Sequence, residues 1–198
     1  MNIITALDEY KINFALDYAL IGTPAEREKD LYDLISEMAN DPNSSKFRED
    51  VTKMMIGLRP SEGKHGYDDD FEAIEVKPQN YTGTARKLNG AGKFTDFTWA
   101  RHQKYAADNV RMVVSGFNRG KLLYIVEFPY DNLESIVVKN LSRLLPNGDE
   151  TNRYVRALQF GYQHWVDKPH VISYVSPKLD EHKAVIVGPL YTHLTTEA

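Results

Sequence analysis

The sequence predicts one α/β (α+β) domain, in which a mixed central sheet is flanked by helices and the N-terminal part is helical. Apolar residues recur at helical spacing over the first part of the chain. Further along, short runs rich in Val, Ile, Leu and Tyr are separated by a helical segment. At 198 residues the chain is long enough to bury a core as a single domain. We divide it into a helical part, 1–60, and a sheet-containing part, 61–198.

Three helices are expected in the first part, over residues 6–20, 25–40 and 46–58. The second begins at Thr23-Pro24, a cap followed by proline at the first helical position. The third follows Ser45, a residue that caps helices well. Its apolar stripe predicts that one face packs inward, through Phe47, Val51, Met54 and Met55.

The second part opens with a strand expected over Phe71–Lys77, which Pro78 should end because proline cannot donate to a ladder. A polar loop is predicted over 80–92, and then a helix from Thr95 or Asp96 to Asn109. Strands at 110–117 and 121–128 flank the hairpin turn 118–120. A helix is expected from Pro129 to Leu145. The segment 151–165 fits helix or strand, and late strands are expected at 171–175 and 184–187.

Composition and charge restrict the chemistry. The chain has no Cys, so disulfides, Cys-ligated zinc and thiol nucleophiles are excluded. Charged residues interrupt the apolar N-terminal stretch, so we expect no signal peptide or membrane span and a cytoplasmic location. The net charge is -4, but 62–77 holds six acids against two bases, and 86–121 holds eight bases against two acids. An acidic pocket beside a basic stretch suits a metal next to a phosphate backbone, although ordinary variation in surface charge would also produce it.

Glu75-Val76-Lys77 is the pattern most indicative of function. Side chains alternate across a strand, so Glu75 and Lys77 should share one face, with Ile74 and Val76 on the other. A carboxylate beside an ammonium, with further carboxylates just upstream at 68–70, is typical of a metal-dependent phosphodiesterase. A solvated strand face bearing a Glu–Lys pair is the alternative.

The stretch Gly66-Tyr67-Asp68-Asp69-Asp70, followed by Ile74-Glu75-Val76-Lys77-Pro78, resembles the PD-(D/E)xK nuclease superfamily, whose fold many type II restriction endonucleases share. The resemblance implies a restriction-endonuclease-like core. It assigns metal binding to Glu75 and to an upstream acid, for which Asp68 is the first choice and Asp70 the second. Lys77 would help to activate water, and the Val76 carbonyl is a further candidate ligand. In that family the first acid usually lies further upstream than 68–70, and here no Pro precedes the Asp.

The function expected is therefore Mg²⁺-dependent hydrolysis of double-stranded DNA, with Mn²⁺ as a substitute metal and Asp68, Glu75 and Lys77 as catalytic residues. A homodimeric, sequence-specific type II restriction enzyme is the subtype that the resemblance favours. The alternatives are a nuclease of the same fold in repair, recombination or phage DNA processing, and a non-catalytic DNA-binding module. Side chains that we expect to contact DNA are Gln79, Asn80, Lys93, Arg101 and Lys104.

Overall fold

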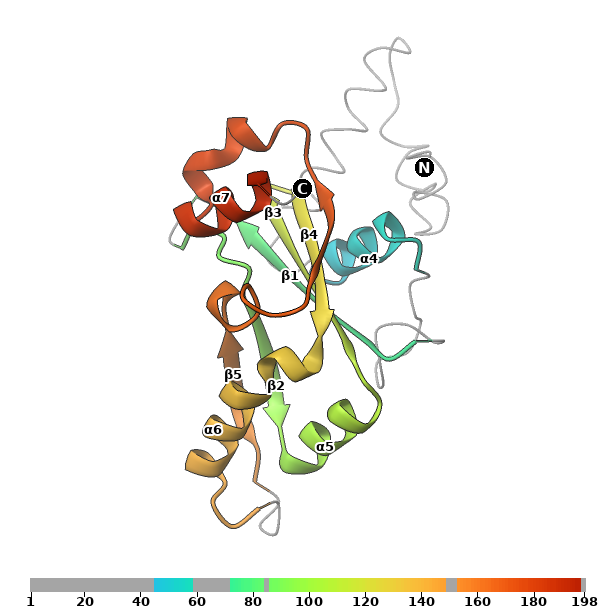
Figure 1. Ribbon diagram of the computed structural model, residues 1–198, viewed down its shortest axis with the longest axis vertical. Coiled ribbons are helices and arrows are strands. Elements are labelled where there is room, and N and C mark those ends of the chain that lie inside the picture. Colours follow the sequence, from blue (N-terminus) through green and yellow to red (C-terminus); the bar gives the residue numbers. More distant parts are fainter. Residues whose placement is uncertain (1–44, 59–71, 84–85, 149–152, 197–198) are drawn as a thin grey trace, which may run out of the picture.

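The computed structural model describes residues 45–58, 72–83, 86–148 and 153–196 (Figure 1). The helices expected at 6–20 and 25–40 lie outside these residues. The elements are α4 Ser45–Met55, β1 Ile74–Tyr81, β2 Gly92–Phe97, α5 Trp99–Ala107, β3 Arg111–Asn118, β4 Lys121–Pro129, η1 Tyr130–Leu133, α6 Glu134–Leu144, β5 Val155–Phe160, η2 Tyr162–His164, β6 Val171–Val175, η3 Leu179–Val185 and α7 Gly188–Thr196.

Four strands form a mixed sheet in the order β1-β3-β4-β6, as the sequence predicts for the fold class. β1 runs parallel to β3, and the other neighbours are antiparallel. The chain passes from β1 to β3 through β2 and α5, because a parallel pair needs a crossover connection. β2 leaves the main sheet and pairs instead with β5 in a two-stranded antiparallel ribbon.

The two faces of the main sheet are covered differently. Val113 packs with Ile74 and Val76 in a small cluster on one face, near α4, which lies against β1 (Figure 1). Met112 and Val114 belong to the large core on the other face, with residues of the β2–β5 ribbon, α6 and α7. Glu75 and Lys77 are paired with Met112 and Val114 in the parallel register, so their side chains point to the large-core face.

β1 does not end at Pro78, contrary to the prediction, but continues to Tyr81. The Arg111 amide donates to the Ala73 carbonyl, so the backbone groups of Ala73 point toward β3. Every second residue of a strand has the same orientation, so the backbone groups of Glu75 and Lys77 also point toward β3. Pro78 has the opposite parity and faces the side of β1 on which no strand of the described residues pairs. Its missing N–H therefore costs no hydrogen bond of the β1–β3 ladder, and proline is tolerated here.

The helix expected from Thr95 or Asp96 begins later, at Trp99. Thr98 is its cap, since its side-chain oxygen accepts a hydrogen bond from the Arg101 amide at 3.1 Å. Residues 92–97 form β2 by pairing with β5, and in this strand Phe94 and Phe97 are buried while Thr95 and Asp96 are exposed. The prediction missed β2, which lacks strict alternation.

The hairpin of β3 and β4 and the helix after Pro129 are confirmed, the latter as η1 followed by α6. The ambiguous segment resolves into β5 and η2, and the strand at 171–175 is confirmed as β6. The strand expected at 184–187 is wrong. Those residues end η3, and only Ile186 bridges, to Leu88, before the unpredicted helix α7.

α4 is confirmed as a helix, but its most buried face is not the predicted one, since Phe47, Val51 and Met54 are only half-buried. Met55 is exposed, whereas Arg48, Asp50, Thr52 and Lys53 are buried. The hydroxyl groups of Thr52 and Ser115 lie 2.7 Å apart, so this helix meets β3 through a polar contact. Lys53 is buried because Glu49 pairs with it at 2.8 Å. No helix in the described part of the chain has the length and apolar character needed to cross a membrane.

Candidate active site on strand β1

Glu75 and Lys77 lie side by side near the start of β1, as the alternation predicts. Glu75 is 5% exposed, and the Lys77 ammonium donates to its Oε1. The Lys77 Nζ also lies 5.7 Å from the centroid of the Phe94 ring in β2. A buried carboxylate thus stands beside an ammonium that solvent still reaches, because the Lys77 side chain is 20% exposed.

Helix α5 adds two side chains to this pair. Arg101 and Tyr105 are four residues apart, so they occupy the same face of the helix. The Tyr105 hydroxyl donates to Glu75 Oε2 at 2.5 Å and accepts from Arg101 Nη2 at 2.6 Å. Arg101 Nη2 lies 3.6 Å from Glu75 Oε1. Lys77 and Tyr105 therefore engage one Glu75 oxygen each, and Arg101 adds positive charge beside them.

Electrostatics keep Glu75 ionised. Burial alone would raise the pKa of its carboxyl, but the charge and hydrogen bond of Lys77, the Tyr105 hydroxyl and the Arg101 charge together outweigh it. The pKa of Glu75 is lowered as a result. Burial and the Glu75 charge raise the pKa of Tyr105 above its usual range, so this hydroxyl remains a donor. At neutral pH the group presents one fixed anion among cationic and neutral donors.

Val76 directs its carbonyl away from β3. It has the same parity as Pro78, so its backbone groups lie on the opposite side of β1 from the β1–β3 ladder. Each Glu75 oxygen has lone pairs beyond the one used by its hydrogen bond. Oxygen donors of this kind fit Mg²⁺, which prefers carboxylate and carbonyl oxygens. Glu75 and Val76 are thus compatible with the expected metal.

The proposed upstream acids, Asp68 and Asp70, lie outside the described residues, as does Asp69. Within the described ranges, no three His, Asp or Glu side chains gather in a way that would hold a metal ion. A metal at Glu75 would therefore need a further ligand from outside the described residues, and the assignment of that ligand to 68–70 stays a prediction.

The five expected DNA contacts are dispersed. Arg101 joins the Glu75 group, and Lys93 and Lys104 are exposed on β2 and α5. Gln79 instead forms two hydrogen bonds with Asn89, at 3.1 Å and 3.0 Å, which tie the loop before β2 to β1. Asn80 accepts from the Gly120 amide at 3.4 Å, beside the β3–β4 turn.

Tyr105 is a residue of this group that the sequence did not assign to the site. Its spacing from Arg101 was the available signal. The structure also brings together two histidines whose spacing in the sequence is not that of metal ligands. His170 and His193 bring their Nε2 atoms within 2.8 Å, and both rings lie beside Trp165.

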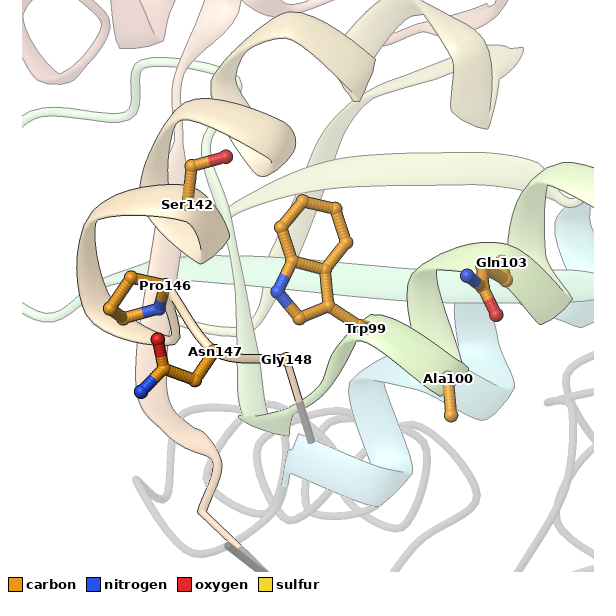
Figure 2. A pocket seen from close by; sticks show the side chains of 7 residues that line it. All are labelled: Trp99, Ala100, Gln103, Ser142, Pro146, Asn147 and Gly148. Carbon is orange, nitrogen blue, oxygen red and sulfur yellow. The ribbon is translucent and has the colours of Figure 1, made fainter. Parts of the chain in front are cut away.

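A hollow of about 500 Å³, separate from the Glu75 group, lies between the start of α5 and the end of α6 (Figure 2). The Trp99 ring stands in it, and its Nε1 donates to the Leu145 carbonyl at 3.0 Å. None of the described residues that line this hollow is charged. It therefore lacks groups for acid–base or metal chemistry, and the Glu75 group is the better candidate site.

Comparison with known proteins gives no assignment: no model of a protein family matches this chain, and no curated protein sequence matches it either.

Proposed function

We propose that this protein is a Mg²⁺-dependent endonuclease that hydrolyses phosphodiester bonds in double-stranded DNA, with a restriction-endonuclease-like core. The observation that carries the proposal is the Glu75–Lys77 pair on one face of β1, with the Glu75 pKa lowered. A buried carboxylate that is ionised at neutral pH is suited to a divalent cation. The strand–helix–parallel strand order of β1, α5 and β3 agrees with such a core.

When bound, Mg²⁺ supplies charge stabilisation at the phosphate and a bound water of lowered pKa. Glu75, the Val76 carbonyl and an acid from 68–70 would hold it, with Asp68 as the first choice. Lys77 would orient the attacking water beside Glu75, and Mn²⁺ would substitute for Mg²⁺. Arg101, partly exposed next to Glu75, would bind a phosphate oxygen.

Within this class we favour a cytoplasmic type II restriction enzyme that acts as a homodimer, because of the sequence resemblance around Glu75 and Lys77. Two-fold symmetry would then match a palindromic site. A nuclease of the same fold that acts in repair, recombination or phage DNA processing would use Glu75 and Lys77 in the same way. Cleavage at one fixed sequence distinguishes a restriction enzyme from such a nuclease.

A non-catalytic DNA-binding module is the second candidate. The observation in its favour is that Glu75 is already satisfied inside the protein by Lys77 and Tyr105. Such a structural ion pair needs no reaction to explain it.

Cleavage of supercoiled plasmid and long phage DNA tests the proposal. The assay compares wild type, Glu75→Ala and Lys77→Ala in Mg²⁺ and in Mn²⁺. Glu181→Ala and Lys139→Ala remove the same groups from exposed positions elsewhere and serve as matched controls. We expect discrete bands from wild type and both controls, and intact DNA from both site variants.

A smear would keep the nuclease and reject the restriction subtype. Intact DNA in every lane with both metals would reject the nuclease, and bound but uncut DNA would establish the second candidate.

A further inference from the structure

A polar groove of about 420 Å³ opens directly beyond Lys77. It begins at Pro78 and Gln79 of β1 and is closed by the loop before β2 and by the residues that follow β5. Arg86, Lys93 and His164 are its titratable groups, and none of the described residues that line it is acidic. The groove is therefore a positively charged hollow next to an anionic carboxylate that a metal could neutralise.

The walls of the groove are held in place by specific contacts. Gln79 and Asn89, which both line it, form two hydrogen bonds with each other, and next to Asn89 the Gly90 carbonyl accepts from Trp165 Nε1 at 2.9 Å. Gly92 has no room for a side chain, because a Cβ there would lie 2.4 Å from the Phe160 ring and 3.0 Å from Lys77 Cβ. The groove is thus built on the same packing that positions Lys77.

The lining has the donors that a polyanion needs. Arg86 and Lys93 are exposed, and Gln159 and Gln163 add exposed side-chain amides. His164 Nδ1 lies 3.0 Å from the Gly161 amide nitrogen and 3.1 Å from the Gly161 carbonyl oxygen, so the ring is held beside Gly161. Cations with amide donors, and without carboxylates, are the groups with which proteins hold phosphates and sugars.

We propose that this groove binds the phosphodiester backbone of the nucleic-acid strand beside the scissile bond, with Arg86 and Lys93 as the phosphate-binding cations. The proposal rests on the function proposed for Glu75 and Lys77. Gln79 lies two residues beyond Lys77 on the same face, roughly 7 Å along the strand. With a rise of about 3.4 Å per nucleotide, the groove takes a phosphate one or two nucleotides from the bond that is cut.

Equilibrium binding in EDTA, where no cleavage occurs, tests this assignment. Fluorescence anisotropy of a short labelled duplex is measured over a series of KCl concentrations with the full chain. The groove variant is Arg86→Gln with Lys93→Gln. The matched control, Lys139→Gln with Arg143→Gln, removes the same charges from the exposed side of α6. Thermal unfolding confirms that both variants are folded.

The groove variant is expected to bind about tenfold more weakly near physiological salt, and the slope of log affinity against log salt should fall by about two, because two phosphate contacts are lost. The control should retain the wild-type slope. Equal affinity and slope in the two double variants would overturn the assignment.

The two proposals fail in different ways. If wild type cleaves DNA while the groove variant binds and cleaves as the control does, the groove assignment fails and the nuclease stands. If wild type never cleaves but loses DNA affinity only through the groove variant, the groove stands as a nucleic-acid site and the nuclease fails. The groove assignment would also be overturned if the groove variant bound the duplex as wild type does and lost only its affinity for an acidic protein.

Discussion

Glu75 stays ionised in a buried position because of three neighbouring side chains, which come from β1 and α5. Burial of an ionised carboxylate is unfavourable unless opposite charges and donors compensate for it. Lys77 comes from the same strand, while Tyr105 and Arg101 come from α5. Because Tyr105 is itself held by Arg101, the helix fixes the orientation of the carboxylate as well as its charge.

Tyr105→Phe tests that positioning role. It removes the hydroxyl that donates to Glu75 and leaves the ring packed, so the loss is confined to the hydrogen bonds. We expect a decrease of about 1–3 kcal/mol in the free energy of unfolding. Cleavage should fall by about tenfold, as for other residues that orient a metal ligand. Urea unfolding and plasmid cleavage are the measurements.

Tyr154→Phe is the matched control, because Tyr154 is 53% exposed. Equal stability and equal cleavage in the two variants would contradict a positioning role for Tyr105. A stability loss without any change in the metal dependence of cleavage would make Tyr105 a purely structural residue.

The lowered pKa of Glu75 predicts a pH dependence of stability. The folded state favours the ionised form, so this stabilisation is complete above the unfolded pKa, about 4.3 for Glu. It is lost as the pH falls from there through the lower folded value. We therefore expect wild type to be more stable than Glu75→Gln at neutral pH, with a difference that narrows below about pH 4. Urea unfolding from pH 7 to about pH 3 measures it, and a constant difference would contradict the prediction.

At this scale the sequence predicted the shared face of Glu75 and Lys77, because alternation in a strand depends only on local geometry. It could not predict that Tyr105 meets Glu75. That contact depends on where α5 starts and on how the crossover returns it to β1. It also could not predict that Gln79 is engaged by Asn89, since the conformation of the loop between them decides this.

Among the elements, the β3–β4 hairpin turn contains a residue in an unfavourable backbone conformation. Arg119 and Gly120 occupy its two central positions, with φ of 47° and 79°, and Asn118 pairs with Lys121. This is the mirror-image turn that favours Asn followed by Gly. Arg119 adopts a left-handed conformation that is unfavourable for a residue with an ordinary side chain.

Arg119→Asn is therefore expected to stabilise the protein by about 0.5–1 kcal/mol, because Asn tolerates this conformation better than Arg. Chemical denaturation measures the change. Arg119→Ala removes the same charge and long side chain but keeps the backbone penalty, so it should give no such gain. Equal stabilisation by Ala and Asn would show that the side chain of Arg119, and not its backbone, is responsible.

Elements with strong local signals were predictable, and those defined by partners were not. The β3–β4 hairpin and α6 have clear turn chemistry and periodic apolar residues. Pro78 misled the prediction because its backbone faces away from β3, so the β1–β3 ladder needs no amide there. β2 is a strand because β5 pairs with it, whereas the segment 184–187 forms a single bridge, from Ile186 to Leu88, within the described residues.

For the whole molecule, the candidate site depends on the return of the chain from β1 to β3. The crossover places α5 so that Arg101 and Tyr105 meet Glu75, and β2 leaves the main sheet to form one wall of the groove beyond Lys77. The sequence predicted the class of this arrangement but not its order. Strand neighbours are set by long-range packing, and no local pattern specifies that β1 pairs with β3 and not with β2.

Metal binding provides the test at this largest scale, because it would couple the Glu75 group, which β1 and α5 build together, to an acid just upstream at 68–70. A ligand that binds only the folded protein stabilises it, by about 1.4 kcal/mol at ten times its dissociation constant. We therefore expect Mg²⁺ or Mn²⁺ to raise the melting temperature of wild type by a few degrees. Glu75→Gln preserves the shape of the side chain and removes its charge, so its melting temperature should not respond.

Asp68→Asn and Asp70→Asn extend the same measurement to the upstream acids, and the variant that abolishes the shift identifies the second ligand. A shift of equal size in wild type and Glu75→Gln would place the metal elsewhere. In that case the lowered pKa of Glu75 would serve only the ion pair with Lys77, and the edge of β1 would be a structural feature and not a catalytic one.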